Sequence, residues 1–190
     1  MDHESTTSVR LFRPDGYYGT YGYGYGLSIT PDFFGQRLIG HGGSIAVSTA
    51  YMAFIPDIEA GVVMMGNSSG MNYATIAESV LAILMGEDPA EALPGLYIRE
   101  RMKRLTGSYE VYRGIERLKV VNRGGLLYLE EKSRRTEKTS LTPLIPEDPT
   151  LSSVAFYVLR NGLKSPVEFV IREDGQIDLF IGRYCYHKVD

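Results

Sequence analysis

The sequence contains a single cysteine, Cys185, among 190 residues, so no disulfide can form within one chain. Structural disulfides belong to oxidising compartments, and a chain without one favours a reducing, cytoplasmic location. Long hydrophobic runs are lacking too. The longest apolar stretches, TIAESVLAILM and AGVVMM, are shorter than the roughly 20 residues that span a bilayer. The first residues, MDHESTTSVRLF, are polar and acidic, unlike a signal peptide, and we expect no membrane partner.

Clusters of basic residues are also lacking, and the formal net charge is −3, so nucleic acid is not an expected partner. No Gly-Lys-Ser or Gly-Lys-Thr triplet occurs, which excludes a phosphate-binding P-loop. Gly22, Gly24 and Gly26 imitate a dinucleotide fingerprint, but they lie inside an expected strand instead of between a strand and a helix. We therefore expect no organic cofactor.

Metal ligands are sparse. The three histidines, His3, His41 and His187, lie far apart in the sequence, and Cys185 with His187 makes an incomplete ligand set. An alternating strand end explains the Cys185–His187 spacing equally well. We therefore expect no metal site.

The region from residue 17 to residue 67 is rich in glycine and tyrosine, with strand-like runs at 21–29, 36–41, 50–55 and 61–66. Tyrosines at 21, 23 and 25 alternate with glycines, which places the rings on one face of an expected strand and bare backbone on the other. The following segment repeats Ile76, Val80 and Leu84 at helical spacing. Asn72 can cap this helix and Gly86 can end it.

The C-terminal half has a different sequence pattern. Residues 87–104 read as a connector with a short helical piece. Eight strand-like runs follow, at 107–112, 117–122, 126–131, 138–144, 153–160, 167–173, 176–181 and 183–188, separated by turn signals such as Asn161-Gly162 and Asp174-Gly175. Strands at this spacing without helices predict a sandwich or a barrel. A count of eight favours a small closed barrel, which removes exposed sheet edges.

The segment GHGGS places His41 before Gly42, Gly43 and Ser44. One interpretation is structural: a strand histidine at a domain edge, with the glycines forming a bulge. The other is functional. A substrate that lies along a strand edge needs free backbone groups and no obstructing side chains. The backbone N–H of Ser44 can then point at a developing oxyanion, and His41 supplies a positioned donor or cation near neutral pH.

The series YGYGYGLSI…GHGGSIAVSTAYMAFIPDIEAGVVMMGNSSG resembles the C-terminal part of the serine β-lactamase-like hydrolases, which include penicillin-binding proteins, class C β-lactamases, D-aminopeptidases and esterases. His41-Gly42-Gly43 matches the His-x-Gly variant of the family's Lys-Thr-Gly signature. The order of the Tyr-Gly strand, the signature strand, the strand ending at Asn67 and the closing helix also matches, over residues 15–86. The segment that opens with LTGSYEVYRG looks like a lipocalin-like domain that is appended to some of these hydrolases.

The resemblance implies an α+β fold: an antiparallel sheet plus a C-terminal helix, followed by an eight-stranded lipocalin-like β-barrel. The expected domains are residues 1–90, part of a β-lactamase/transpeptidase-like domain; 91–104, a linker; and 105–190, the barrel. By the resemblance, His41 and Ser44 act in catalysis, Ser44 through its backbone N–H. Gly42, Gly43 and Tyr25 border a peptide or ester substrate, and Tyr23 is an alternative to Tyr25.

The family's other signatures are missing. No serine is followed by lysine three residues later, and no tyrosine is followed by asparagine two residues later. We therefore expect a C-terminal portion of an acyl-transfer hydrolase that is inactive by itself, with the N-terminal catalytic half as partner. A truncated sheet exposes apolar surface, so a homo-oligomer is expected as well. Two alternatives are non-catalytic: a barrel that binds a small apolar ligand beside an oligomerisation platform, and a regulatory cap acting on a partner.

Overall fold

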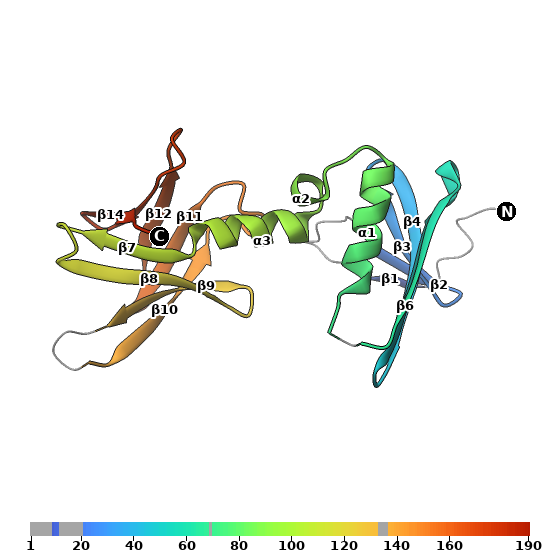
Figure 1. The fold of residues 1–190 in the computed structure, drawn as a ribbon, viewed down its shortest axis with the longest axis horizontal. Helices are drawn as coiled ribbons and strands as arrows, with labels where there is room; N and C mark the ends of the chain where they lie inside the picture. The colour runs from blue at the N-terminus through green and yellow to red at the C-terminus, as the bar shows by residue number, and fades with distance from the viewer. Residues whose placement is uncertain (1–8, 12–20, 69, 133–136) are drawn as a thin grey trace. The chain divides into compact units, whose positions relative to one another are not determined.

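The computed structural model describes residues 9–11, 21–68, 70–132 and 137–190. The chain divides into two compact units, Met1–Pro94 and Gly95–Asp190. The first unit holds an antiparallel six-stranded sheet in which each strand pairs with the next along the chain (Figure 1). Its strands are β1 (Val9–Leu11), β2 (Tyr21–Gly24), β3 (Leu27–Phe33), β4 (Gln36–Ile45), β5 (Ser48–Ile55) and β6 (Ala60–Gly66), and the 3-10 turn η2 (Pro56–Ile58) connects β5 to β6.

The predicted single strand at residues 21–29 is wrong, because the structure breaks it into the hairpin of β2 and β3. Tyr25 and Gly26 form the two-residue connection, and both have positive φ, 52° and 79°. Two consecutive left-handed residues are the signature of the hairpin turn that matches strand twist. The Tyr-Gly alternation runs straight through this turn, so the pattern conceals it.

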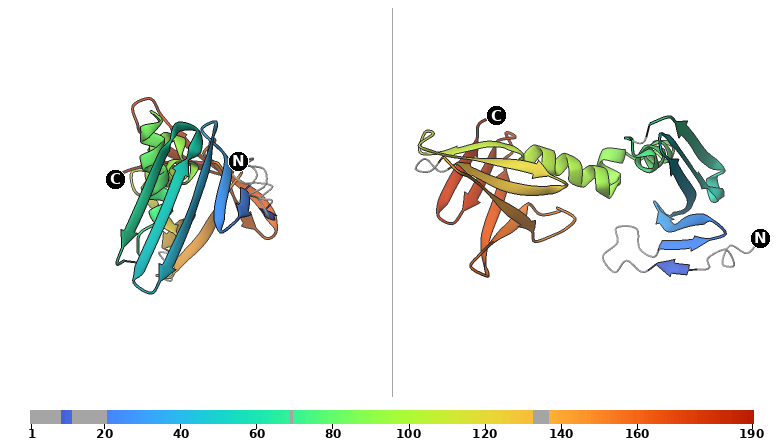
Figure 2. Two further views of the ribbon diagram at one scale, coloured as in Figure 1. Left: turned by 90° about the vertical axis from the view of Figure 1, so that its right-hand side faces the viewer. Right: turned by 90° about the horizontal axis from the view of Figure 1, so that it is seen from below.

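Helix α1 (Tyr73–Leu84) lies across one face of the sheet, against β5 and β6 (Figure 2). The side chain of Asn72 caps the helix, as predicted, by accepting the backbone N–H of Thr75 at 3.2 Å. The helix buries Tyr73, Ala77, Leu81 and Ala82, and the buried strand residues Ala53 and Ile55 supply the facing apolar surface. This layer forms the core of the first unit.

The second unit is a closed antiparallel barrel of eight strands, which confirms the predicted barrel. The strands are β7 (Gly107–Val111), β8 (Glu116–Arg123), β9 (Leu126–Lys132), β10 (Thr139–Pro146), β11 (Ala155–Arg160), β12 (Leu163–Ile171), β13 (Ile177–Ile181) and β14 (Tyr184–Lys188). Their order around the barrel is β10-β11-β12-β13-β14-β7-β8-β9. Closure pairs β14 with β7 and β9 with β10, so each strand has two neighbours.

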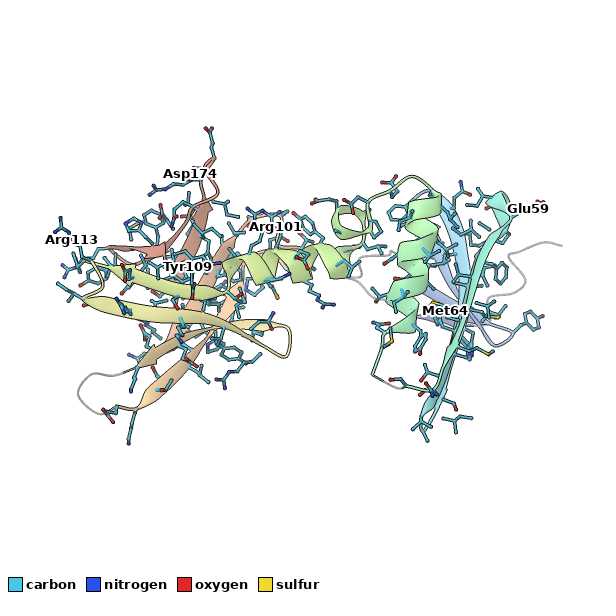
Figure 3. All side chains as sticks on the ribbon, in the orientation of Figure 1. Glu59, Met64, Arg101, Tyr109, Arg113 and Asp174 are labelled. Carbon is cyan, nitrogen blue, oxygen red and sulfur yellow. The ribbon has the colours of Figure 1, made fainter. Side chains whose placement is uncertain are left out.

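Two helices occupy the stretch in which the sequence predicted a connector with a short helical piece: α2 (Pro89–Ala92) and α3 (Pro94–Leu105). Met102 and Leu105 of α3 are buried in the barrel core, and Ile98 packs against it. The hydroxyl of Tyr109, a core residue of β7, donates a hydrogen bond to the carbonyl of Leu105 at 2.8 Å (Figure 3). The last turns of α3 are therefore part of the barrel's packing. Over the described residues, no helix combines the length and apolarity that crossing a bilayer requires.

Candidate functional site

The GHGGS segment lies in the second half of β4, at a point where the sheet opens. Within the described residues, the register between β3 and β4 reaches only to Gly40, whereas the pairing of β4 with β5 continues to Ile45. His41 to Ser44 are exposed. The segment is therefore an extended strand with one edge directed away from its pairing partner, which is the backbone geometry that strand-edge recognition requires.

His41 meets a tyrosine from the neighbouring hairpin. Its Nε2 lies 3.3 Å from the hydroxyl of Tyr23, and the two rings are tilted with their centroids 6.2 Å apart. Both side chains line a cavity of about 330 Å³, together with Ser28, Thr30, Tyr51 and Glu78. The cavity thus joins an imidazole, two phenols and a carboxyl, groups that can donate to or accept from a polar ligand.

Two of the glycines make room for Tyr51. A Cβ on Gly42 would lie 2.9 Å from Cδ2 of the Tyr51 ring, and a Cβ on Gly40 would lie 2.8 Å from the carbonyl oxygen of Met52 and 3.2 Å from the Tyr51 hydroxyl. Gly43 differs, because a Cβ at this residue would have no neighbouring atom of the described residues within 4 Å. Close packing within the sheet therefore requires glycine at 40 and 42, while residue 43 faces open space.

The remaining predicted site residues lie at different places. Ser44 pairs with Thr49 in the β4–β5 ladder, and their hydroxyl oxygens are 3.1 Å apart. Tyr25 lies at the tip of the β2–β3 hairpin, with 82% of its surface exposed, and does not belong to the lining of the His41 cavity. Tyr23, the alternative, does. Strand register alone decides between the two tyrosines, and the sequence contains no signal for it.

Glu78 is a cavity residue that the sequence analysis missed. It comes from α1, beside the buried helix residue Ala77, and burial raises its pKa above the ordinary value of 4.5. A glutamate beside the apolar face of a helix is a weak sequence signal for a functional site, because most such side chains are solvated. Only the packing of α1 on the sheet brings Glu78 toward His41.

The glycine contacts give a matched pair of stability predictions. We expect Gly40→Ala to lower the free energy of unfolding by about 1–3 kcal/mol, because its Cβ meets backbone that cannot move without distorting β5. Gly43→Ala is the control, since its Cβ enters open space, and we expect a change within about 0.5 kcal/mol. Urea unfolding followed by circular dichroism measures both. Equal losses would contradict the packing role of Gly40.

Glu78 predicts a pH dependence of known sign. Because burial raises its pKa in the folded state, the protonated form is favoured there, and this stabilisation is present at low pH and lost as pH rises through the folded-state pKa. Above the ordinary pKa the unfolded state ionises more readily than the folded state, and this lowers the free energy of unfolding. We therefore expect Glu78→Gln to raise the urea midpoint at pH 7, with the difference vanishing below pH 4.5. A lower midpoint for the variant at pH 7 would show that the carboxylate is stabilised instead.

The barrel interior is a second place where a ligand site was conceivable, and side chains fill it. Tyr109, Phe156 and Phe169 are buried, and the rings of Phe156 and Phe169 meet edge to face with centroids 5.5 Å apart. Aliphatic side chains from the strands complete this core, among them Leu118, Val120, Leu127, Leu129, Leu144, Val158, Val167 and Leu179. The barrel interior is therefore a packed apolar core over the described residues.

One end of the barrel exposes apolar side chains. Strand direction alternates around the barrel, so the β7–β8, β11–β12 and β13–β14 hairpins share this end, which Arg113 marks in Figure 3. We call the following six residues of these hairpins the hairpin rim: Tyr112, Ile115, Leu159, Leu163, Arg183 and Tyr184. Leu163 is 73% exposed and Ile115 60%. Tyr112 and Tyr184 meet edge to face at 6.1 Å, and the Arg183 guanidinium lies 5.0 Å from the Tyr184 ring centroid.

This composition is typical of a protein contact, because exposed aliphatic groups, tyrosine and arginine concentrate at interface centres. Comparison with known families also indicates a domain that makes protein contacts. Residues 89–187 match the profile of the Pab87 octamerisation domain. The chain belongs to this family. The match spans α2, α3 and nearly all of the barrel, up to His187 on the last strand.

A solved structure extends the similarity beyond the residues that match the Pab87 octamerisation domain. The octameric penicillin-binding protein homologue from Pyrococcus abyssi is 35% identical to the chain, with a TM-score of 0.81, over 97% of this chain and 41% of the homologue. Structures of SurE with D-Leu and of SurE match at 20% and 19% identity, with TM-scores of 0.34 and 0.33. They cover 97% of this chain, which covers 43% and 42% of theirs. The chain thus spans less than half the length of each of these solved relatives. No curated protein matches it.

Proposed function

We propose that the chain is an assembly module, in which the Pab87 octamerisation domain joins copies of the protein into a homo-octamer. The observation that supports this proposal most directly is that the barrel interior is filled with side chains while the hairpin rim exposes apolar side chains. A filled interior argues against the ligand-binding alternative for the barrel. The family name and the octameric Pyrococcus homologue support the stoichiometry.

The hairpin rim is the contact surface in this proposal, and a second copy of the chain is its occupant. Burying Leu163, Ile115 and Tyr112 removes large apolar side chains from water, each contributing about 1.5–3 kcal/mol when fully covered. We also assign α3 to the barrel unit instead of to a linker, because Met102 and Leu105 are part of the barrel core. The assembly domain then begins near Pro94 and not at residue 105.

Site-specific crosslinking tests the location of the contact. A photoreactive residue at Leu163 is expected to join two copies of the chain upon illumination. The matched control is Val189, which is 54% exposed and follows the end of β14 that lies opposite the hairpin rim. Crosslinked dimers from position 189 but not from position 163 would place the contact elsewhere and contradict the proposal.

A second proposed role concerns the sheet unit, as part of the substrate site of a serine hydrolase of the penicillin-binding-protein type. The contact between His41 and Tyr23 favours it, because it lies beside a strand edge that pairs with no other described strand beyond Gly40. In this role His41 orients the substrate carbonyl, the Ser44 N–H contributes to an oxyanion hole, and the nucleophile comes from a segment that this sequence lacks. Peptides and simple esters are the proposed substrates. The domain boundary that we propose for the sheet unit is residue 90.

A further inference from the structure

A carboxylate is buried on the outer wall of the barrel. Asp178 lies on β13 between Ile177 and Leu179, which both belong to the barrel core, so strand alternation directs Asp178 to the exterior. Its exposed fraction is nevertheless only 2%, and it is the one buried charged residue among the described residues. Buried carboxylates require compensating partners, and the neighbouring strand and loop provide them.

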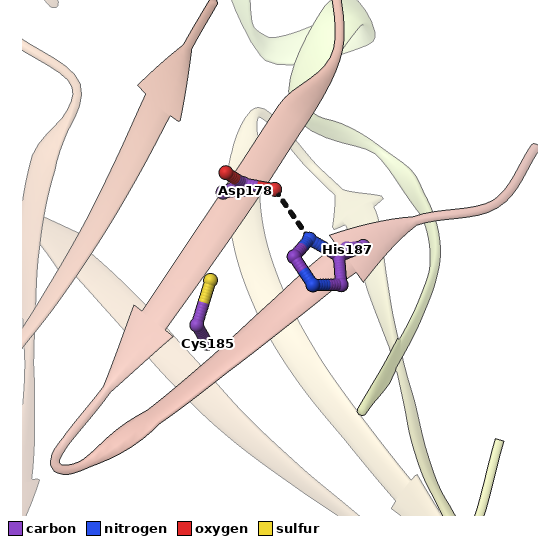
Figure 4. A group of neighbouring side chains, drawn as sticks. All are labelled: Asp178, Cys185 and His187. Atoms are coloured by element: carbon purple, nitrogen blue, oxygen red, sulfur yellow. Dashed lines mark hydrogen bonds and ion pairs between the residues drawn. The ribbon is translucent and has the colours of Figure 1, made fainter. Parts of the chain in front are cut away.

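Strand register brings a histidine and the only cysteine to this carboxylate. Asp178 pairs directly with His187 of β14, and Cys185 pairs with Phe180, which makes Cys185 the diagonal neighbour of Asp178 on the same face. Diagonal neighbours on a sheet face lie within reach of each other's side chains. The sulfur of Cys185, a ring nitrogen of His187 and a carboxylate oxygen of Asp178 all lie within 4.8 Å of one another (Figure 4).

The two carboxylate oxygens have different partners. Oδ1 of Asp178 lies 2.7 Å from Nδ1 of His187, the contact drawn as a dashed line in Figure 4. Oδ2 accepts the Nε–H of Arg172 at 2.7 Å and also forms an ion pair with Nη2 of the same guanidinium. Arg172 thereby orients the carboxyl group, and Oδ1 is directed toward His187.

We propose that Asp178, Cys185 and His187 bind a zinc ion. A thiolate sulfur, an imidazole nitrogen and a carboxylate oxygen are the three ligand types that zinc takes, and three protein ligands leave a fourth position for water or another donor. Arg172 holds the carboxyl group from behind, in the manner of the hydrogen-bonded groups that support metal ligands. The ion carries two positive charges against the two negative charges of thiolate and carboxylate.

The geometry needs a small adjustment. In a tetrahedral site with bonds of about 2.0–2.3 Å, neighbouring ligand atoms lie about 3.3–3.8 Å apart. Nδ1 and Oδ1 must therefore separate by roughly half an ångström from their present 2.7 Å, and the sulfur must approach. The side chain of His187 is 54% exposed, so its rotation meets little resistance, and the same exposure gives the ion a path from solvent.

The ion also has to displace a proton from the thiol. Burial and the charge of Asp178 raise the pKa of Cys185, and Arg172 opposes this with a smaller effect. Zinc binds the thiolate form of cysteine, so binding releases the thiol proton. A purely structural network of Arg172, Asp178 and His187 makes no use of the sulfur. Dependence on Cys185 is therefore the property that separates the two explanations.

Cobalt(II) substitution in the full chain is the test, because the cobalt–thiolate bond has its own near-ultraviolet charge-transfer absorption. We expect this absorption and intense visible bands to saturate at one cobalt per chain, and zinc to bleach both. Cys185→Ser is expected to abolish the charge-transfer absorption. His187→Gln removes a metal ligand, and we expect it to weaken cobalt binding at least as strongly as removal of the Arg172 guanidinium does. Arg172→Gln is expected to weaken it by about 10- to 100-fold.

His41→Gln is the matched control, a histidine of the other unit whose loss is expected to leave the cobalt titration unchanged. Circular dichroism establishes that each variant retains the barrel. His3 lies outside the described residues, and a His3→Gln variant controls for binding at the chain start. If the parent chain shows no charge-transfer absorption, or if zinc binds Cys185→Ser and His187→Gln as tightly as the parent, the proposed zinc site is wrong.

Discussion

Replacing both Ile115 and Leu163 by glutamate is expected to convert the assembled chain into monomers of 21.2 kDa. Both side chains belong to the hairpin rim and are more than half exposed, so the substitutions leave the barrel core untouched. In the assembly, each introduced carboxylate becomes a charge without a partner in an apolar contact. Such a charge destabilises by about 3–5 kcal/mol, which weakens each contact more than roughly 100-fold.

The control for this experiment is Val189→Glu, which adds the same charge at a similarly exposed valine at the other end of the barrel. We expect it to remain assembled. Size-exclusion chromatography with light scattering measures the mass of all three proteins, and circular dichroism verifies that the strands persist. An assembled double variant together with a monomeric Val189→Glu would assign the contact to the opposite end of the barrel.

Loss of the imidazole at position 41 is expected to reduce hydrolysis by about 100- to 1000-fold, the effect of removing one positioned donor from an acyl-transfer site. The experiment uses a chimera in which this chain replaces the matching 41% of the Pyrococcus homologue, so that the upstream part is present. Hydrolysis of a p-nitrophenyl ester gives the rate, and a fluorophosphonate probe reports acylation. The chain by itself is expected to acquire no label, because it lacks a serine followed by lysine three residues later.

Two variants act as controls for His41→Ala. Ser44→Gly retains the backbone N–H, so we expect most of the activity to remain. Tyr25→Phe changes a hairpin tip that does not line the His41 cavity, so we expect no loss. Full activity of His41→Ala in an active chimera would contradict the assignment of the sheet unit to the substrate site. An inactive chimera beside an active homologue would contradict it as well.

The barrel could be predicted from the sequence because its signals are local. Apolar alternation and turn pairs such as Asn161-Gly162 mark each strand independently, and the positive φ values of both residues show that this turn has the expected form. Helix α1 was predictable for the same reason, from the spacing of its apolar residues and the Asn72 cap. Closure into a barrel then followed from the number of strands.

Features that depend on register could not be predicted. The packing of Tyr51 over Gly42 and the meeting of Tyr23 with His41 join residues from different strands, and a shift of one residue would reverse every face. The same applies to Asp178 beside His187, which turns an incomplete Cys-His pair into a set of three ligand types. Helix α3 was underestimated because its apolar residues face the barrel, a partner that the local pattern does not reveal.

The mass of the full chain in solution, measured by light scattering across a dilution series, tests the proposed assembly most directly. A Pab87 octamerisation domain that assembles through its hairpin rim predicts a stable species of eight chains, eight times 21.2 kDa, that persists until strong dilution. A single chain of 21.2 kDa at all concentrations would contradict it.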